Sequence, residues 1–239
     1  FHAKANPYPM YKALENVANR STQKMVLIEC GFYANESIKD AFTEAFQNLS
    51  PNIRIIRVDG TNNELRLKSF AAAHIFCSLS DNIQETFGIT PIEAMASGLP
   101  VVVSDWDGYR ESVRNNIDGF CIPTLMPPSG YGLDLARRYA LDIDNYDQYI
   151  GYTSNFISVD LKSTSAAFLK LICNEKLRDE LGSNAKKRAI ENFDWKNIIL
   201  QYHDLWDYLQ SIRSEGVDNF NDYNWAAKLD PFDAFSAYP

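Results

Sequence analysis

The chain has 239 residues, of which 46% are hydrophobic and 23% are charged, a balance typical of an ordinary soluble globular protein. Its formal net charge of −8 argues against non-specific binding to nucleic acid and against docking on an anionic membrane surface. The sequence contains neither a secretory signal nor an apolar run long enough to span a bilayer. Its four widely spaced cysteines form no zinc-binding pattern, so we expect buried thiols in a cytoplasmic protein.

The first half of the chain alternates between predicted helices and predicted strands. Helices are expected at 9–19, 35–49 and 62–72, and strands at 24–31, 53–58, 73–78 and 99–103. Because short connections join them, the strands should be parallel, which predicts an α/β fold with an open, doubly wound, Rossmann-like sheet. Such sheets bind ligands beyond the carboxyl ends of their strands. Segments 60–61, 80–89 and 104–108 fall at such ends, and we expect them to converge on one crevice.

The segment 80–98 carries the densest set of signals in the chain. Thr90 is a suitable N-cap, Pro91 suits the first helical position, and Glu93 would complete a capping box. Gly98 then ends the predicted helix. A helix that starts after a glycine-containing loop presents free backbone N–H groups and the positive end of its dipole. This turn is therefore predicted to bind an anion.

The same segment resembles a known family. Glu85 and Glu93 lie eight positions apart and frame Thr-Phe-Gly-Ile-Thr-Pro-Ile, which resembles the E-x7-E signature of retaining family-4 glycosyltransferases. The likeness continues through Ala-Met-Ala-Ser-Gly-Leu-Pro and through 107–113, which resembles the family's Gly-Gly-x-x-Glu-Val-Val, although Asp107 replaces the first glycine. The resemblance implies the C-terminal, donor-binding half of a GT-B glycosyltransferase, with extra C-terminal helices.

The resemblance also implies roles for individual residues. Glu93 would accept both ribose hydroxyls of a nucleoside diphosphate sugar, and Glu85 would meet hydroxyls of the transferred sugar. Lys4 would hold the donor diphosphate, although Ala5 stands where the family has glycine, and the arginine that assists this lysine would precede Phe1. The catalytic candidates are Lys4 and Glu85, and the donor-binding candidates are Gly60, Thr61, Ser80, Thr86, Phe87, Gly88, Ile89, Thr90 and Glu93.

Several of these residues also have a purely structural interpretation. Glu93 could serve only the capping box, Lys4 could be a solvated lysine, and Phe87 is more typical of a core anchor than of a ligand contact. The loop from Ser80 to Glu85 is about two residues longer than the family's Ser-x-x-Glu. The triplet at 105–107 resembles a metal-chelating D-x-D, but its context is that of a metal-independent family. No metal and no cofactor are therefore expected.

The chain after Pro123 is predicted to be mostly helical. We expect a loop at 125–132, an unassigned stretch at 142–158, and helices at 133–141, 163–173, 175–181, 183–192 and 195–212. Residues 1–213 would form the donor-binding domain, and 214–239 a tail or linker. The chain would then be a piece of a longer protein that also contains an N-terminal acceptor-binding domain.

The predicted function is transfer of a hexose from a nucleoside diphosphate sugar to an acceptor hydroxyl, with the anomeric configuration retained. Backbone N–H groups at 88–90, together with Lys4, would stabilise the negative charge that grows on the leaving diphosphate. Two alternatives stay open, namely a nucleotide-sugar epimerase of the same fold and a non-catalytic module that binds nucleotide sugars. The expected partners are the sugar donor and the missing domain, with no nucleic acid and no transmembrane segment.

Overall fold

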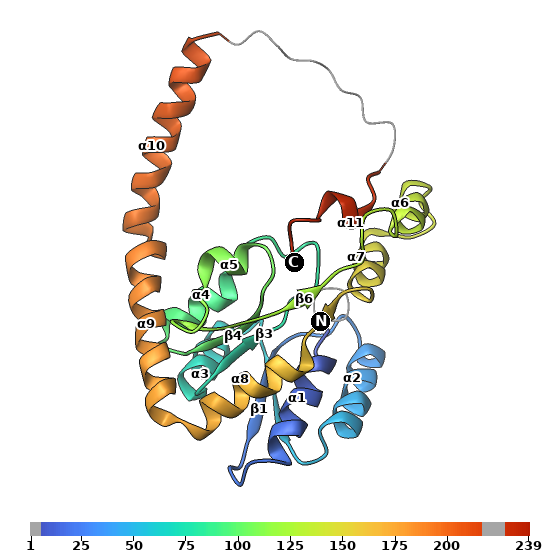
Figure 1. Ribbon diagram of the computed structural model, residues 1–239, viewed down its shortest axis with the longest axis vertical. Coiled ribbons are helices and arrows are strands. Elements are labelled where there is room, and N and C mark those ends of the chain that lie inside the picture. The colour runs from blue at the N-terminus through green and yellow to red at the C-terminus, as the bar shows by residue number, and fades with distance from the viewer. Residues whose placement is uncertain (1–5, 217–227) are drawn as a thin grey trace.

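The computed structural model describes residues 6–216 and 228–239 (Figure 1). Its first half contains α1 (Tyr8–Ala18), β1 (Val26–Gly31), α2 (Glu36–Leu49), β2 (Arg54–Asp59), α3 (Asn63–Ala72), β3 (Phe76–Ser78), α4 (Ile89–Ala96), β4 (Val101–Ser104), α5 (Gly108–Ser112) and β5 (Gly119–Ile122). Its second half contains β6 (Thr124–Leu125), α6 (Leu133–Ala140), α7 (Tyr146–Ser154), β7 (Ser158–Val159), α8 (Leu161–Cys173), α9 (Glu175–Phe193), α10 (Trp195–Ser214) and α11 (Pro231–Ala234). The predicted alternation of helix and strand is confirmed.

The strands pair in parallel, as predicted, but they form separate ladders. β1 pairs with β2, and β4 lies between β3 and β5, both of which run parallel to it. β6 and β7 form a short antiparallel pair. The α/β class is therefore confirmed, while the hydrogen bonds of the described strands divide the expected single sheet into two ladders, β1–β2 and β3–β4–β5.

Helices cover both faces of β4, whose residues are all buried. Because side chains of a strand alternate between faces, Val102 points one way and its neighbours Val101 and Val103 point the other. Val102 belongs to a cluster with buried residues of α1 and α8, namely Ala13, Val17, Ala167, Phe168 and Leu171. Val101 and Val103 belong to a cluster with residues of α4, α5 and α9, namely Ala94, Met95, Tyr109, Ala185 and Ala189. This is the doubly wound arrangement.

Helix α9 is continuous where a break was expected between two helices. Gly182 lies in its middle and is buried. A Cβ atom at this position would lie 2.3 Å from the carbonyl oxygen of Gly98 and 3.3 Å from Cδ of Pro100. The glycine therefore does not end the helix; it lets α9 approach the turn between α4 and β4.

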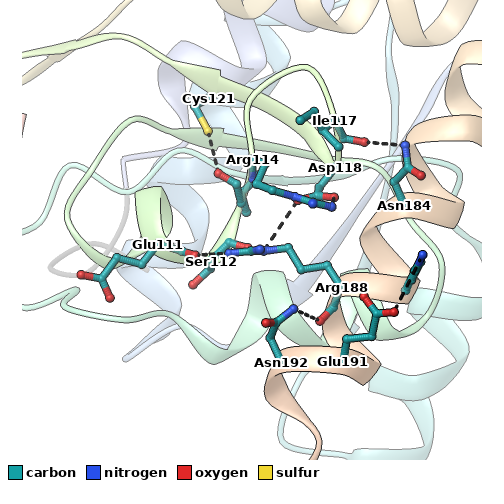
Figure 2. Close-up of polar contacts among 12 residues, drawn as sticks. Glu111, Ser112, Arg114, Ile117, Asp118, Cys121, Asn184, Arg188, Glu191 and Asn192 are labelled. Carbon is teal, nitrogen blue, oxygen red and sulfur yellow. Dashed lines mark hydrogen bonds and ion pairs between the residues drawn. The ribbon is translucent and has the colours of Figure 1, made fainter.

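Charged side chains fasten α9 and the segment 114–118 to the end of α5 (Figure 2). Arg188 of α9 donates to the carbonyl oxygens of Ser112 at 2.7 Å and Glu111 at 2.6 Å. Such carbonyls at a helix C-terminus have no partner within the helix. The carboxylate of Asp118 is fully buried and lies 2.7 Å from Arg114 and 3.7 Å from Arg188. The C-terminal end of α5 is therefore held by α9.

The unassigned stretch at 142–158 contains α7, and the described part of the predicted tail contains α11. The two segments pack together with residues from the first half of the chain. Their shared cluster, called here the insertion–tail cluster, contains Ile83, Met126, Leu135, Trp106, Tyr139, Tyr149, Ile150, Ile157, Phe235 and Tyr238. Residues 228–239 thus contact the body of the protein, while the predicted domain boundary at residue 213 stays a prediction.

Helix α10 extends away from the body (Figure 1), and all its residues from Ile199 onward are exposed. None of the helices in the described ranges combines the length and the apolar character needed to cross a membrane. The four cysteines have free thiols. Cys30, Cys77 and Cys121 are half-buried, whereas Cys173 at the end of α8 is exposed, so the expectation of a buried thiol is wrong for Cys173.

The close approach of Gly182 to the Gly98 carbonyl oxygen can be tested by mutation. Replacing glycine by alanine inside a helix normally stabilises it by about 1 kcal/mol. We expect Gly182→Ala to lower the free energy of unfolding by about 1–3 kcal/mol instead, because the new methyl group would displace α9 from the Gly98 carbonyl. Chemical denaturation measures this. The neighbouring exposed Ser183→Ala serves as the control and should leave stability nearly unchanged; equal stability of the two variants would contradict the close approach.

Candidate functional site

Helix α4 begins differently from the prediction. Its N-cap is Gly88, with φ of +73°, and no side chain among the described residues caps the helix. Thr90 lies inside the first turn, so the predicted Thr90 cap, the first helical position of Pro91 and the capping box of Glu93 are wrong. Because no side chain caps them, the first backbone N–H groups of α4 can bind an anion.

Tyr109 explains why residue 88 is glycine. A Cβ atom at Gly88 would lie 2.0 Å from Cε1 of Tyr109, whose ring is 1% exposed. The Tyr109 hydroxyl lies 2.9 Å from Oγ of Ser78 at the end of β3. Burial, and then the charge of nearby Glu85, raise the pKa of Tyr109. The ring therefore lies directly under the turn that starts α4, on the side of Glu85.

Two loops meet at this turn, as expected for loops that follow neighbouring parallel strands. Oγ of Ser104 donates to the carbonyl oxygen of Ser80 at 2.6 Å, and Nε1 of Trp106 donates to the carbonyl oxygen of Asn82 at 3.1 Å. A Cβ atom at Gly108 would lie 2.2 Å from the Thr86 carbonyl oxygen. The predicted convergence of 80–89 and 104–108 is therefore confirmed.

Glu93 projects from α4 and pairs with Arg66 of α3. Oε1 of Glu93 accepts from Nη1 of Arg66, while Nη2 of Arg66 donates to Asn63 at 2.8 Å. Both side chains of the ion pair are about one third exposed, at 34% for Arg66 and 31% for Glu93. The pair joins α3 to α4 and holds a partly accessible carboxylate one helical turn after the free N–H groups.

The remaining candidates are distributed over several surfaces. Thr61 binds the Asp59 carboxylate through its backbone N–H at 2.9 Å and its hydroxyl at 2.7 Å. Gly60 packs on Gly31, since a Cβ there would lie 2.8 Å from Cα of Gly31. These contacts are local to the ends of β1 and β2, so the expected convergence of Gly60 and Thr61 on the same crevice stays a prediction. Lys4 lies outside the described residues.

The four exposed candidates within two residues of Gly88 are Thr86, Phe87, Ile89 and Thr90. Phe87 is 42% exposed, and its ring lies 6.2 Å from that of Phe193. The interpretation of Phe87 as a core anchor is therefore wrong. The side chain instead stays accessible at the rim of the α4 turn.

The D-x-D-like triplet has a structural role. Trp106 is fully buried, and Asp105 pairs with Arg110 at 2.9 Å. Within residues 6–216 and 228–239, no group of three or more His, Cys, Asp or Glu side chains could hold a metal ion. The expectation that the reaction needs no metal stays a prediction.

Asp81 is a buried acidic residue that no local sequence pattern indicated. Its side chain is 2% exposed, and its Oδ1 atom has no hydrogen-bond partner among the described residues. Burial raises the pKa of Asp81 to about 7, although backbone N–H groups, including that of Asn6, lower it. An acidic residue in a polar loop looks solvated in sequence. The extra length of the 80–85 loop is the signal that could have pointed to it.

Two surface hollows lie elsewhere. One lies between α1 and α8 and is lined by Asn16, Arg20, Leu161, Lys162 and Ser165. The other lies on α9 and is lined by Ser183, Lys186, Lys187, Ile190 and Glu191. Neither is lined by a residue of the α4 turn.

Comparison with known proteins identifies a family and a fold. The family model described as "Glycosyl transferases group 1" matches residues 1–126. An uncharacterized glycosyltransferase from Methanocaldococcus jannaschii is 21% identical over 190 residues, which are 79% of this chain and 38% of that protein. A phosphatidyl-myo-inositol mannosyltransferase from Mycobacterium leprae is 38% identical over 77 residues, which are 31% of this chain and 19% of that protein.

Solved structures share the fold over most of the chain. Sucrose-phosphate synthase from Thermosynechococcus elongatus matches with a TM-score of 0.54 and 20% identity, over 87% of this chain and 44% of that one. Anabaena HepE, solved in complex with UDP-glucose, matches with a TM-score of 0.53 and 17% identity, over 86% of this chain and 47% of that one. The chain therefore spans less than half the length of these proteins and has the predicted GT-B type of fold.

The contact between Gly88 and Tyr109 can be tested with a matched pair of glycines. Both Gly88 and Gly130 have positive φ, but a Cβ at Gly130 meets nothing within 4 Å. Each replacement by alanine costs about 1–2 kcal/mol of backbone strain. We expect Gly88→Ala to lower the melting temperature more than Gly130→Ala, because only Gly88→Ala also collides with a buried ring. Similar losses in thermal unfolding would contradict the assigned contact.

The raised pKa of Asp81 predicts a pH dependence of stability. Its folded-state pKa of about 7 exceeds the ordinary value of 3.8, so its stabilising contribution is complete below about pH 4 and lost as the pH rises to 7. The wild type should therefore lose up to about 1.4 kcal/mol per pH unit across this window, and Asp81→Asn should remove that slope.

Asp59 provides the opposite control. Its hydrogen bonds with Thr61 lower its pKa, so its contribution is present at neutral pH and lost as the pH falls. Asp59→Asn should therefore leave intact the loss of stability between pH 4 and 7. Chemical denaturation at several pH values measures both variants, and an unchanged slope in Asp81→Asn would show that Asp81 is ionised throughout.

Proposed function

The chain belongs to the group 1 glycosyltransferases, and we propose that it is the part of such an enzyme that binds a nucleoside diphosphate sugar. The enzyme would transfer a hexose to an acceptor hydroxyl with the anomeric configuration retained. The observation that carries the proposal is the uncapped start of α4 behind Gly88, with Glu85 before it and Glu93 after it. The UDP-glucose complex of Anabaena HepE, which shares the fold, supports a uridine nucleotide as the first probe.

The diphosphate would bind at the N–H groups of residues 88–90. These groups and the helix dipole supply positive potential without a bound cation. That matters in a chain with a net charge of −8, where a dianionic ligand needs local donors. In the transition state the same donors would stabilise the charge that develops on the leaving diphosphate.

The two glutamates would hold the two ends of the donor. One oxygen of Glu93 already accepts from Arg66, and the other oxygen would accept ribose hydroxyls. Glu85 precedes Gly88 in the chain, and its charge contributes to the raised pKa of Tyr109; it would accept hydroxyls of the transferred sugar. The chemistry of leaving-group stabilisation requires no covalent nucleophile from this chain.

The acceptor would be bound by another part of a longer protein. The support for this is length, because the chain spans 38% of the archaeal relative and 47% of HepE. A cleft closed by a second domain would exclude water and strengthen the interactions at the α4 turn.

The role of Glu93 can be separated from its ion pair with Arg66. Glu93→Gln keeps the shape of the side chain but removes the charge that would accept two hydroxyls. We expect the affinity for UDP, measured by calorimetry, to fall about fivefold to tenfold, which corresponds to about 1.0–1.4 kcal/mol. Glu64→Gln on the exposed face of α3 is the matched control, and it should bind UDP as the wild type does.

Melting temperatures of the same variants complete this test. If Glu93 only ties α3 to α4, Glu93→Gln will lower the melting temperature and leave the UDP affinity unchanged. That combination would refute the proposed ribose contact.

A further inference from the structure

The described end of the chain, 228–239, docks on the loop at 129–132. The side chain of Asp230 accepts from the backbone N–H groups of Phe232 at 2.7 Å and Gly132 at 2.8 Å. Ser129 donates to Asp233 at 2.8 Å, and Phe232 is 1% exposed. These contacts combine buried apolar area with satisfied polar groups. The segment therefore has a defined position on the protein, next to α6 and α7 (Figure 1).

From this position the segment reaches the loop that follows β4. The carbonyl oxygen of Tyr238 accepts from the backbone N–H of Asp107 at 3.0 Å and from Nη2 of Arg110 at 2.7 Å. Nη1 of Arg110 also donates to the carbonyl oxygen of Ala237 at 3.3 Å. The Tyr238 ring stands edge-on against Trp106, with centroids 5.3 Å apart. Figure 1 places the C-terminal segment beside α5.

Asp107 has an unusual backbone that this contact helps to hold. Its φ of +36° and ψ of −123° lie in a region that is strained for a residue with a side chain. Such strain persists only where the surroundings impose it. The bond from the Asp107 N–H to Tyr238 is one of the restraints, and the Arg110 guanidinium supplies two more.

The loop held in this way touches the α4 turn. Trp106 donates its indole N–H to the Asn82 carbonyl and packs in the same cluster as Ile83. Gly108 passes against the Thr86 carbonyl. Restraint therefore passes from Tyr238 through 105–108 to the 82–88 loop, which carries Glu85 and leads into Gly88.

We propose that residues 228–239 are a positioning element of the donor site, which holds the 82–88 loop in register with the start of α4. The identity of the ligand in this inference rests on the proposed function. The restraint acts on the Glu85 side of the turn, because Glu93 is held separately by Arg66 of α3. Loss of the contact should therefore weaken the binding of the sugar and diphosphate more than that of the nucleoside.

The experiment uses the full chain with two variants and one control. Tyr238→Ala removes the ring that packs on Trp106. Arg110→Gln removes the guanidinium bonds to the two tail carbonyls together with those to Asp105. Tyr131→Ala is the control, because Tyr131 is a tyrosine of the docking loop itself but is 75% exposed. Each protein is titrated with UMP and with UDP-glucose, and amide hydrogen exchange is measured without ligand.

We expect the variants to change the affinities for the two ligands by different amounts. The affinity for UMP should stay within about twofold, whereas that for UDP-glucose should fall about fivefold or more in Tyr238→Ala and Arg110→Gln. Amides at 80–88 should exchange faster in both variants, while those of α8 should not change. A purely structural contact would instead lower the two affinities together or alter only the melting temperature, which would overturn the proposal.

Hydrogen exchange separates this inference from the proposed function. If the wild type binds neither nucleotide, the proposed function fails, and exchange at 80–88 still decides whether 228–239 positions the loop. If exchange at 80–88 is unchanged in both variants, the positioning role is refuted whatever the nucleotide affinities are. Should Tyr238→Ala fail to fold, Arg110→Gln decides, with Asp105→Asn as its control, because Asp105→Asn weakens the ion pair within the loop and leaves the bonds from Arg110 to the tail in place.

Discussion

The close passage of residue 108 beneath the Thr86 carbonyl is the constraint on which the rest of the candidate site depends. A side chain at Gly108 would push the two loops apart. The next residue, Tyr109, would then no longer lie under Gly88, and the left-handed turn that starts α4 would lose its support. The free N–H groups of α4 are therefore directed by a backbone contact between two loops and not by a local capping motif.

Helix α5 transmits this constraint because both of its ends are fixed. Arg188 of α9 binds the carbonyl oxygens at its C-terminal end, and the buried Asp118 carboxylate lies beside that arginine. At its N-terminal end, Arg110 and the strained Asp107 meet the C-terminal segment. A five-residue helix has little stability of its own. Its placement comes from these contacts, and so does the position of Tyr109.

Local sequence patterns predicted strands β1 to β4, most helix ends and the convergence of the loops after β3 and β4, since these follow from periodicity and from parallel topology. The prediction of a capping box was wrong because the conformation of Gly88 depends on its contact with Tyr109. A rule based on neighbouring residues does not include that contact. The predicted break in α9 was wrong for a similar reason. Gly182 is there because the Gly98 carbonyl oxygen approaches the helix closely, and not because the helix ends. The burial of Asp81 also depends on segments that are distant in sequence, and so does the insertion–tail cluster. Periodicity within one segment predicts neither of them.

The insertion–tail cluster makes two distant stretches of sequence interdependent. Tyr149 and Ile157 of the insertion and Tyr238 of the tail pack in one cluster with Trp106 and Ile83. A chimera that received 126–157 without 228–239 would expose an aromatic surface to water. A chimera that received only 228–239 would lack the residues against which this segment packs. The two stretches therefore form one exchangeable unit, and protein engineers would have to transplant them as a pair.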